Sequence, residues 1–163
     1  MIVDVGLDAV ISAFIRNPEL SSIQYKARQN TIVMEMILTD NIDCQKQQLF
    51  LRRTTAALKM LHQLKGKEAL KLSIEFCNQG NISILTLYRD AFTLTEEEID
   101  LYVRLAGLEF SNMLLRETDE SVLQNNKIND IKKRLMQNIN HKNDRANNIF
   151  AYRDRGKMFV FDK

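Results

Sequence analysis

Apolar and polar residues alternate in the middle of the chain, between residues 70 and 88. The apolar residues from Leu70 to Phe76 occupy every second position, so a strand would place them all on one side. Asn78-Gln79-Gly80-Asn81 follows, and these residue types favour a tight turn. A second, β-branched and apolar run then covers residues 82–88. The pattern predicts a β-hairpin.

The next segment has the signature of a helix start. In Thr95-Glu96-Glu97-Glu98, the Thr95 hydroxyl can accept from the amide of Glu98, and the Glu98 carboxylate can reach back to the amide of Thr95. We therefore expect a helix from Glu96 to about Arg116. At about 100° per residue, one of its faces is a core face. That face contains Ile99, Tyr102, Val103, Ala106, Phe110, Met113 and Leu114.

The opposite side of this helix is apolar as well. Its seam consists of Leu101, Leu105, Leu108, Asn112 and Leu115. A helix with two apolar faces is either buried between layers or offers one face to a partner, and a polar residue such as Asn within a seam fixes the register of paired helices. Two interpretations stay open: the seam packs on the chain's own C-terminal helix, or it forms the interface of a homodimer.

The remaining patterns extend this picture. The sequence predicts a helix over residues 5–16, a hairpin over residues 23–38, and a helix from the Asp40–Asp43 region to Leu64, ended by Gly66 as a left-handed cap. The buried stripe expected on that helix is Phe50, Leu51, Thr54, Ala57, Leu58, Leu61 and Leu64. The order helix, hairpin, helix, hairpin, helix indicates an α+β fold, with an antiparallel sheet and helices on one of its faces.

The C-terminal part differs from the rest. We expect a core domain over residues 1–117, followed by residues 118–163 with a narrow helical stripe at residues 128–139, an Asn-rich linker at 138–148 and a terminal hairpin. The hairpin carries Phe150, Tyr152, Phe159 and Phe161. It is too apolar to stay in water, and an isolated two-stranded hairpin is marginal. It therefore docks on its own sheet or on a partner chain.

Composition narrows the class of protein. The chain has 163 residues, 45% of them hydrophobic, and a net charge of +2, as in an ordinary single-domain globular protein. Cys44 and Cys77 have no CxxC partners, and we expect reduced, structural thiols. The N-terminus lacks a basic region followed by a cleavage site, and no apolar run reaches the length of a bilayer span. We expect a cytoplasmic protein that does not associate with membranes.

Recurring catalytic and cofactor motifs are missing from the sequence: it has no P-loop, GxGxxG, GxSxG or HExxH pattern. His62 and His141 are isolated, and His62 lies beside the expected stripe of its helix, where a solvated or hydrogen-bonded role is expected. Helix capping explains the acidic residues from Glu96 to Asp100. We predict no catalytic residue, cofactor or metal, while a buried Glu35 or Glu75 would point to an unfamiliar enzyme.

Basic residues suggest a second function. The cations are Lys46, Arg52, Arg53 and Lys59 on one expected helix and Arg153, Arg155 and Lys157 in the terminal hairpin. They could contact phosphates, and the aromatic residues beside the hairpin cations could stack on bases. A pI of 8.5 is low for such a domain. The favoured hypothesis is a non-catalytic interaction or regulatory protein that self-associates through the seam and the C-terminal segment, with a nucleic-acid-binding protein as the alternative.

Overall fold

The computed structural model describes residues 10–116, 149–154 and 157–162, which form one antiparallel sheet with helices packed on it. This confirms the predicted α+β class. The six strands lie in the order β3-β4-β2-β1-β5-β6. Their bounds are Leu20–Lys26 (β1), Thr31–Leu38 (β2), Leu72–Gln79 (β3), Ile82–Asp90 (β4), Ile149–Asp154 (β5) and Lys157–Asp162 (β6).

Tight turns connect two of the strand pairs, β1–β2 and β3–β4. A single 3-10 turn, η1 (Ala27–Gln29), joins β1 to β2, and Asn30 leaves it in the left-handed conformation with φ of 49°. The β3–β4 turn places Gly80 at φ of 59°, because Gln79 pairs directly with Ile82 and leaves only two residues to reverse the chain. Glycine tolerates this conformation at little cost.

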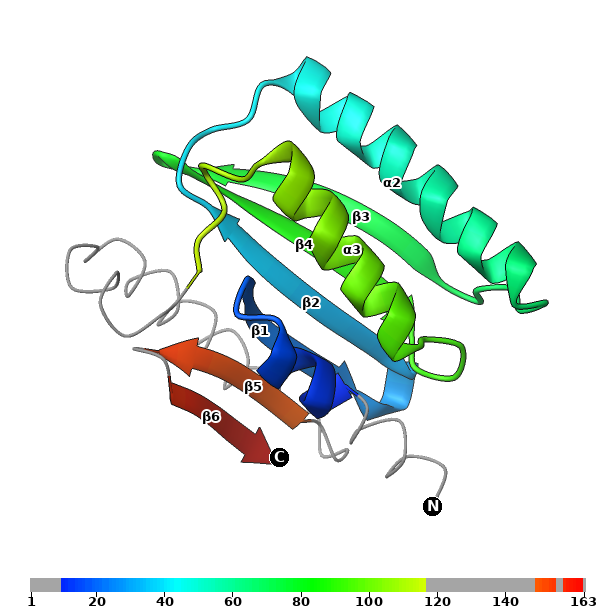
Figure 1. Ribbon diagram of the computed structural model, residues 1–163. Helices are drawn as coiled ribbons and strands as arrows, with labels where there is room; N and C mark the ends of the chain where they lie inside the picture. The colour runs from blue at the N-terminus through cyan, green and yellow to red at the C-terminus, as the bar shows by residue number, and fades with distance from the viewer. Residues whose placement is uncertain (1–9, 117–148, 155–156, 163) are drawn as a thin grey trace.

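Two long helices cover one face of the sheet, α2 (Cys44–Leu64) and α3 (Glu96–Glu109), and a helical segment at residues 10–16 lies on the same face (Figure 1). The Asp43 side chain caps α2 by accepting from the amide of Lys46 at 2.9 Å. The Thr95 hydroxyl caps α3 by accepting from the amide of Glu98 at 3.3 Å. Each cap satisfies a backbone donor that the first helical turn leaves unpaired.

The main core lies between the sheet and this helical layer. An aromatic trio ties α2, β3 and the end of α3 together: the ring centroids of Phe50 and Phe110 are 5.1 Å apart, and Phe76 lies 5.8 Å from Phe50 and 6.0 Å from Phe110. Offset and edge-to-face contacts of this kind add to the stabilisation that burial itself provides.

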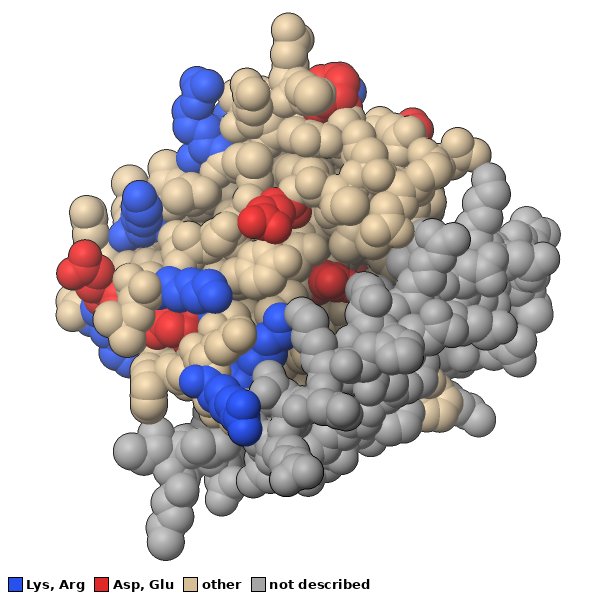
Figure 2. Space-filling model, turned by 180° about the vertical axis from the view of Figure 1, so that it is seen from behind, with Lys and Arg blue, Asp and Glu red and all other residues tan. Residues whose placement is uncertain are grey.

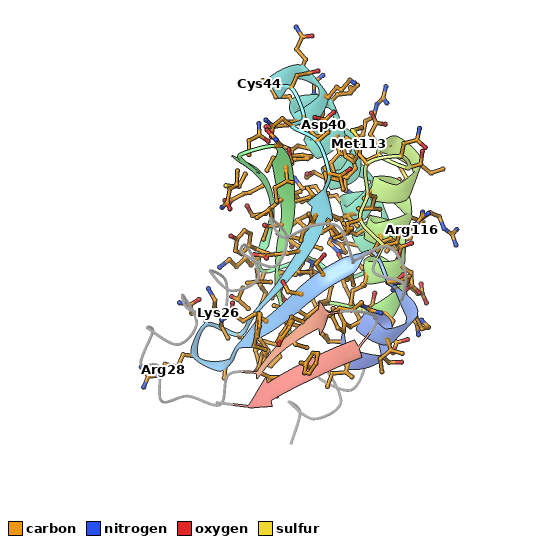
Figure 3. All side chains as sticks on the ribbon, turned by 90° about the vertical axis from the view of Figure 1, so that its left-hand side faces the viewer. Lys26, Arg28, Asp40, Cys44, Met113 and Arg116 are labelled. Atoms are coloured by element: carbon orange, nitrogen blue, oxygen red, sulfur yellow. The ribbon has the colours of Figure 1, made fainter. Side chains whose placement is uncertain are left out.

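The prediction that α3 continues to about Arg116 is wrong. The helix ends at Glu109, and the chain then turns back toward β2, where the amide of Thr39 donates to the carbonyl of Met113 at 2.7 Å. Met113 and Asp40 consequently lie at the same end of β2 (Figure 3). The physical reason is that β1 pairs with β2 only as far as Met36. The last residues of β2 therefore lack β1 as a neighbour, and residues 113–115 pair there instead, with Leu114 opposite Leu38.

The buried stripe predicted for α2 is also partly wrong. The buried residues are Phe50, Thr54, Leu58 and His62, at regular intervals of four, whereas Leu64 is exposed. His62 is buried instead, and its Nε2 contacts the carboxylate of Glu98 on α3. Gly66 follows with φ of 64°, the predicted left-handed conformation that ends the helix region.

The terminal hairpin docks on the chain's own sheet, one of the two outcomes expected from the sequence. Strand β5 pairs with β1, with Ala151 opposite Ile23, and β6 forms the outer edge. The stripe predicted at residues 128–139, the linker at 138–148 and His141 lie outside the described residues. The division of the chain into residues 1–117 and 118–163 stays a prediction.

Candidate functional site

A cluster of ionisable side chains is buried where α2, β4 and α3 meet. Arg89 of β4 is fully buried, and both its Nε and its Nη2 lie 2.9 Å from Oε2 of Glu98 on α3. The other carboxylate oxygen of Glu98 contacts Nε2 of His62 on α2. A single carboxylate therefore links the two helices to the central part of the sheet.

Asp90 completes this cluster and organises the loops beside it. Its carboxylate contacts Nη1 of Arg89, and it accepts from the amides of Leu70 and Lys71 at 3.1 and 3.0 Å. Its other oxygen accepts from the amide and hydroxyl of Thr93 at 3.1 and 2.6 Å. Burial by itself would raise the pKa of Asp90, but the hydrogen bonds from Thr93 and Lys71, with the charge of Arg89, leave this pKa below its ordinary value.

The arrangement of the cluster is that of a structural element. Arg89 also donates to the carbonyl of Lys71 at 3.1 Å and to the hydroxyl of Thr93 at 3.0 Å, so its donors are used within the chain. In the described part of the chain, no group of His, Cys, Asp and Glu is arranged to hold a metal ion. A small hollow with an apolar lining lies elsewhere in the described part of the chain, between residues 10–14, β1 and β5.

Sequence reasoning placed His62 and Glu98 correctly on their helices but missed their roles. Glu98 was expected to bond back to the amide of Thr95. Its carboxylate instead pairs with Arg89 and His62, because a buried guanidinium requires a compensating charge. Two signals in the sequence could have shown this: His62 follows Leu58 of the buried stripe by four residues, and Arg89 comes directly after the run at residues 82–88.

Glu35 and Glu75, the carboxylates proposed for an unfamiliar enzyme, lie on the sheet face opposite the helices, in register on either side of Thr86. Glu75 is exposed. Glu35 is partly buried and accepts from the hydroxyl of Ser22 at 3.2 Å, and burial raises its pKa. Where this side of the molecule is coloured by charge in Figure 2, acidic and basic residues are interspersed. The apolar hollow is not lined by either carboxylate.

The outer side of α2 exposes a row of apolar residues. We call Leu49, Ala56, Met60 and Leu64 the α2 face. The exposed fractions are 36% for Leu49, 63% for Met60 and 80% for Leu64, and Ala56 is exposed too. Figure 1 shows α2 along the margin of the molecule, with no described element on its outer side. Because the opposite stripe of α2 is anchored in the core, this face is presented on a fixed helix.

Two exposed apolar side chains project from the loops near the C-terminal end of α2. Leu70, in the α2–β3 loop, is 75% exposed, and Phe92, in the β4–α3 loop, is 66% exposed. We call the two loops that carry these residues the end loops. Both loops bond to the carboxylate of Asp90, and Lys65 at the end of α2 pairs with Glu97 of α3 at 2.6 Å. The buried cluster thus holds the end loops next to the α2 face.

The structure separates the residues predicted to form a partner interface. Leu101 and Leu105 are half-buried and pack against the core, while Leu108 is 76% exposed. Asn112 and Leu115 are beyond the end of α3, and Leu115 is buried against Ile37, Ile82 and Ile84 on the other sheet face. The continuous seam expected from helical spacing is therefore not formed, because the helix stops before its last two members.

The aromatic residues of the terminal hairpin are largely used within the chain. Phe150 is buried, and its ring lies 5.9 Å from that of Tyr152, which stacks on Phe159 at 5.2 Å. Phe159 is 39% exposed. The side chain of Phe161 lies outside the described residues.

The predicted nucleic-acid contacts divide into two groups. Lys46, Arg52, Arg53 and Lys59 are all exposed on α2. Arg153 is buried, with its guanidinium 4.7 Å above the ring of Phe14, and it donates to the carbonyl of Phe14. The guanidinium of Arg153 is thus held inside the chain, and its expected contact with phosphates stays a prediction. Arg155 and the side chain of Lys157 lie outside the described residues.

Comparisons with protein-family models, with curated proteins and with solved structures found no match to this chain. Over the residues that the structure describes, no helix has the length and apolar character needed to cross a membrane.

Proposed function

We propose that the chain is a non-catalytic protein-interaction protein, and that the α2 face and the end loops form its binding surface. The observation that carries this proposal is the exposure of Met60, Leu64, Leu70 and Phe92 around one end of α2. Apolar side chains gathered on a surface favour contact with a partner, because association removes them from water.

The buried cluster supports the proposal by fixing the geometry of this surface. Asp90 holds the backbone of both end loops, and Glu98 connects α2 to α3 through His62. A surface that is rigid before binding loses less conformational entropy when the partner arrives. The proposed binding surface differs from the one expected from sequence, where the α3 seam and the terminal hairpin were the leading candidates.

Site-specific photocrosslinking in cells tests this function. A photoreactive amino acid at position 60 should give one discrete protein adduct, whose mass identifies the partner as a second copy or another protein. Ile15 provides the matched control, because it is an exposed apolar residue on a different helix. If position 60 gives no adduct, or gives the same adducts as position 15, the proposed function is rejected.

A second candidate function is binding to a single-stranded nucleic acid. The four exposed cations of α2 favour it, because they could neutralise phosphates. In that case, a fluorescent single-stranded RNA should bind at low salt and dissociate steeply as salt rises. Absence of binding at low salt would exclude this candidate.

A further inference from the structure

We infer that the partner of the α2 face is an acidic, amphipathic helical segment of another protein. This inference rests on the proposed function and adds the chemistry of the partner. It is carried by the charges around the α2 face, by their lack of partners among the described ion pairs, and by the length of the apolar row.

The cations of α2 lie on both sides of the middle of its exposed apolar row. At about 100° per residue, Arg52 and Lys59 lie on one side of Ala56 and Met60, and Lys46 and Arg53 lie on the other. Residues 44–64 contain no Asp or Glu. An apolar row with a single-sign polar rim matches a partner whose own apolar row has a rim of opposite charge.

Several exposed cations elsewhere in the described chain have acidic partners. Lys65 pairs with Glu97, Arg16 with Glu96 and Asp100, and Arg116 with Glu19. The ion pairs among the described residues involve none of the four cations that border the α2 face. Their charge is therefore available to a partner.

A second copy of the chain is a poor match to this surface. In a two-fold symmetric dimer the same patch meets itself, so cations along α2 would face cations of the other copy. Like charges brought together across an interface oppose association. This argument favours a different protein over the homodimer expected from the sequence.

The α2 face also favours a peptide over other anionic partners. Its most exposed members are Met60 and Leu64, which gain from apolar contact and gain nothing from phosphates. From Leu49 to Leu64 the α2 face spans about 22 Å of helix at about 1.5 Å per residue, with Arg52 and Arg53 in the turn between Leu49 and Ala56. A partner helix of about four turns, with apolar residues at i, i+3 or i+4 and i+7 and acidic residues beside them, matches this length.

Selection from a library of displayed random peptides tests the inference directly. Peptides of about 15–20 residues, enough for four to five helical turns, are selected on the purified full-length chain. The enriched sequences should share helical apolar spacing and carry an excess of Asp and Glu. The most enriched peptide is then synthesised, and its affinity is measured by fluorescence anisotropy.

Substitutions in the chain locate the peptide and test the role of charge. The triple reversal R52E/R53E/K59E should weaken binding of the acidic peptide at least about tenfold. A peptide that carries Lys in place of the acidic residues should bind this reversed variant with restored affinity. Met60→Asp should weaken binding by a similar factor, since it places a charge in the apolar row. Arg104→Glu, a single reversal of charge on α3, is the control and should change affinity little. Circular dichroism and thermal melting check that each variant folds. If the triple reversal does not fold, the neutral variant R52Q/R53Q/K59Q replaces it, and we expect a smaller loss of affinity for the acidic peptide.

Several results would overturn the inference. These are enriched peptides that are neutral or basic, affinity that is unaffected by the triple reversal or by Met60→Asp, and a crosslinked adduct at position 60 that proves to be a second copy. Binding of single-stranded RNA or of phosphatidylserine-containing vesicles through the same cations, with no acidic peptide enriched, would also overturn it. If position 60 crosslinks to a different protein but the peptide tests fail, only the inference about the acidic helical partner is rejected. If position 60 gives no adduct, the proposed function itself is rejected.

Discussion

Neutralising Glu98 should strongly destabilise the fold. Its carboxylate contacts Arg89 at 2.9 Å through two nitrogens, contacts His62, and is only 1% exposed. The variant Glu98→Gln keeps the size of the side chain and removes its charge. Arg89 then remains buried with Asp90 as its only described carboxylate partner.

The size of the effect follows from the burial of the pair. Removing one partner from a buried ion pair costs about 3–5 kcal/mol, because the remaining charge is left in a poorly solvating environment. Asp90 still contacts Arg89, so we expect about 3 kcal/mol, the lower end of that range. This is a large part of the roughly 5–15 kcal/mol by which a domain is stable. With a denaturant slope of about 2 kcal/mol per molar urea, the unfolding midpoint should fall by about 1.5 M.

Glu97→Gln is the matched control for this measurement. Glu97 is the preceding residue of the same helix and is also paired, with Lys65 at 2.6 Å, but its side chain is 68% exposed. Because exposed pairs contribute about 0–1 kcal/mol, its midpoint should change little. Urea unfolding followed by circular dichroism compares the two variants at neutral pH. Equal destabilisation by the two variants would show that the buried cluster is not what stabilises this part of the fold.

Three further predictions concern the interior and the backbone. Burial raises the pKa of Glu35, so ionisation of this carboxyl at neutral pH destabilises the folded state. Glu35→Gln should therefore increase the free energy of unfolding at neutral pH. This gain should disappear as the pH falls through the raised pKa and below the ordinary value of 4.5, because the wild-type carboxyl is then protonated. Phe110→Ala should cost about 3–5 kcal/mol by opening the aromatic trio, whereas Phe92→Ala should change stability by less than about 0.5 kcal/mol in the same chemical denaturation assay. Gly107→Ala should stabilise α3 by about 0.5–1 kcal/mol, because the nearest atom to an added Cβ is 3.9 Å away. Gly66→Ala should destabilise the protein by about 1 kcal/mol, because φ at this position is 64°. If both variants shifted the thermal melting temperature in the same direction, the backbone argument would be contradicted.

Local signals in the sequence predicted much of the secondary structure. The cap residues Asp43 and Thr95 lie where their helices begin, and Gly66 and Gly80 have the positive φ that their positions require. These features depend on a few neighbouring residues, because a cap or turn is satisfied by groups two to four positions away. The α+β class follows from the same information, since hairpin and helical periodicities differ.

The candidate site was much less predictable. Helical spacing showed that α2 and α3 have apolar residues on more than one side, but spacing alone does not say which side a neighbouring element covers. In the structure Leu101 and Leu105 are half-buried against the core, whereas Met60 and Leu64 are exposed. The sequence had instead suggested a partner seam at Leu101 and Leu105 and a buried Leu64. The proposed binding surface therefore depends on burial in the folded chain, which helical spacing does not determine.

By itself, the sequence of this protein determined where helices and hairpins start and the residue types that cap and turn them. The tertiary structure alone decided that α3 stops at Glu109, that the terminal hairpin joins β1, and that His62 meets Glu98 across 36 positions of the chain. The physical reason is the range of the interactions. Caps and turns are satisfied locally, whereas a buried charge and an unfilled strand edge are satisfied by groups that only the fold brings close.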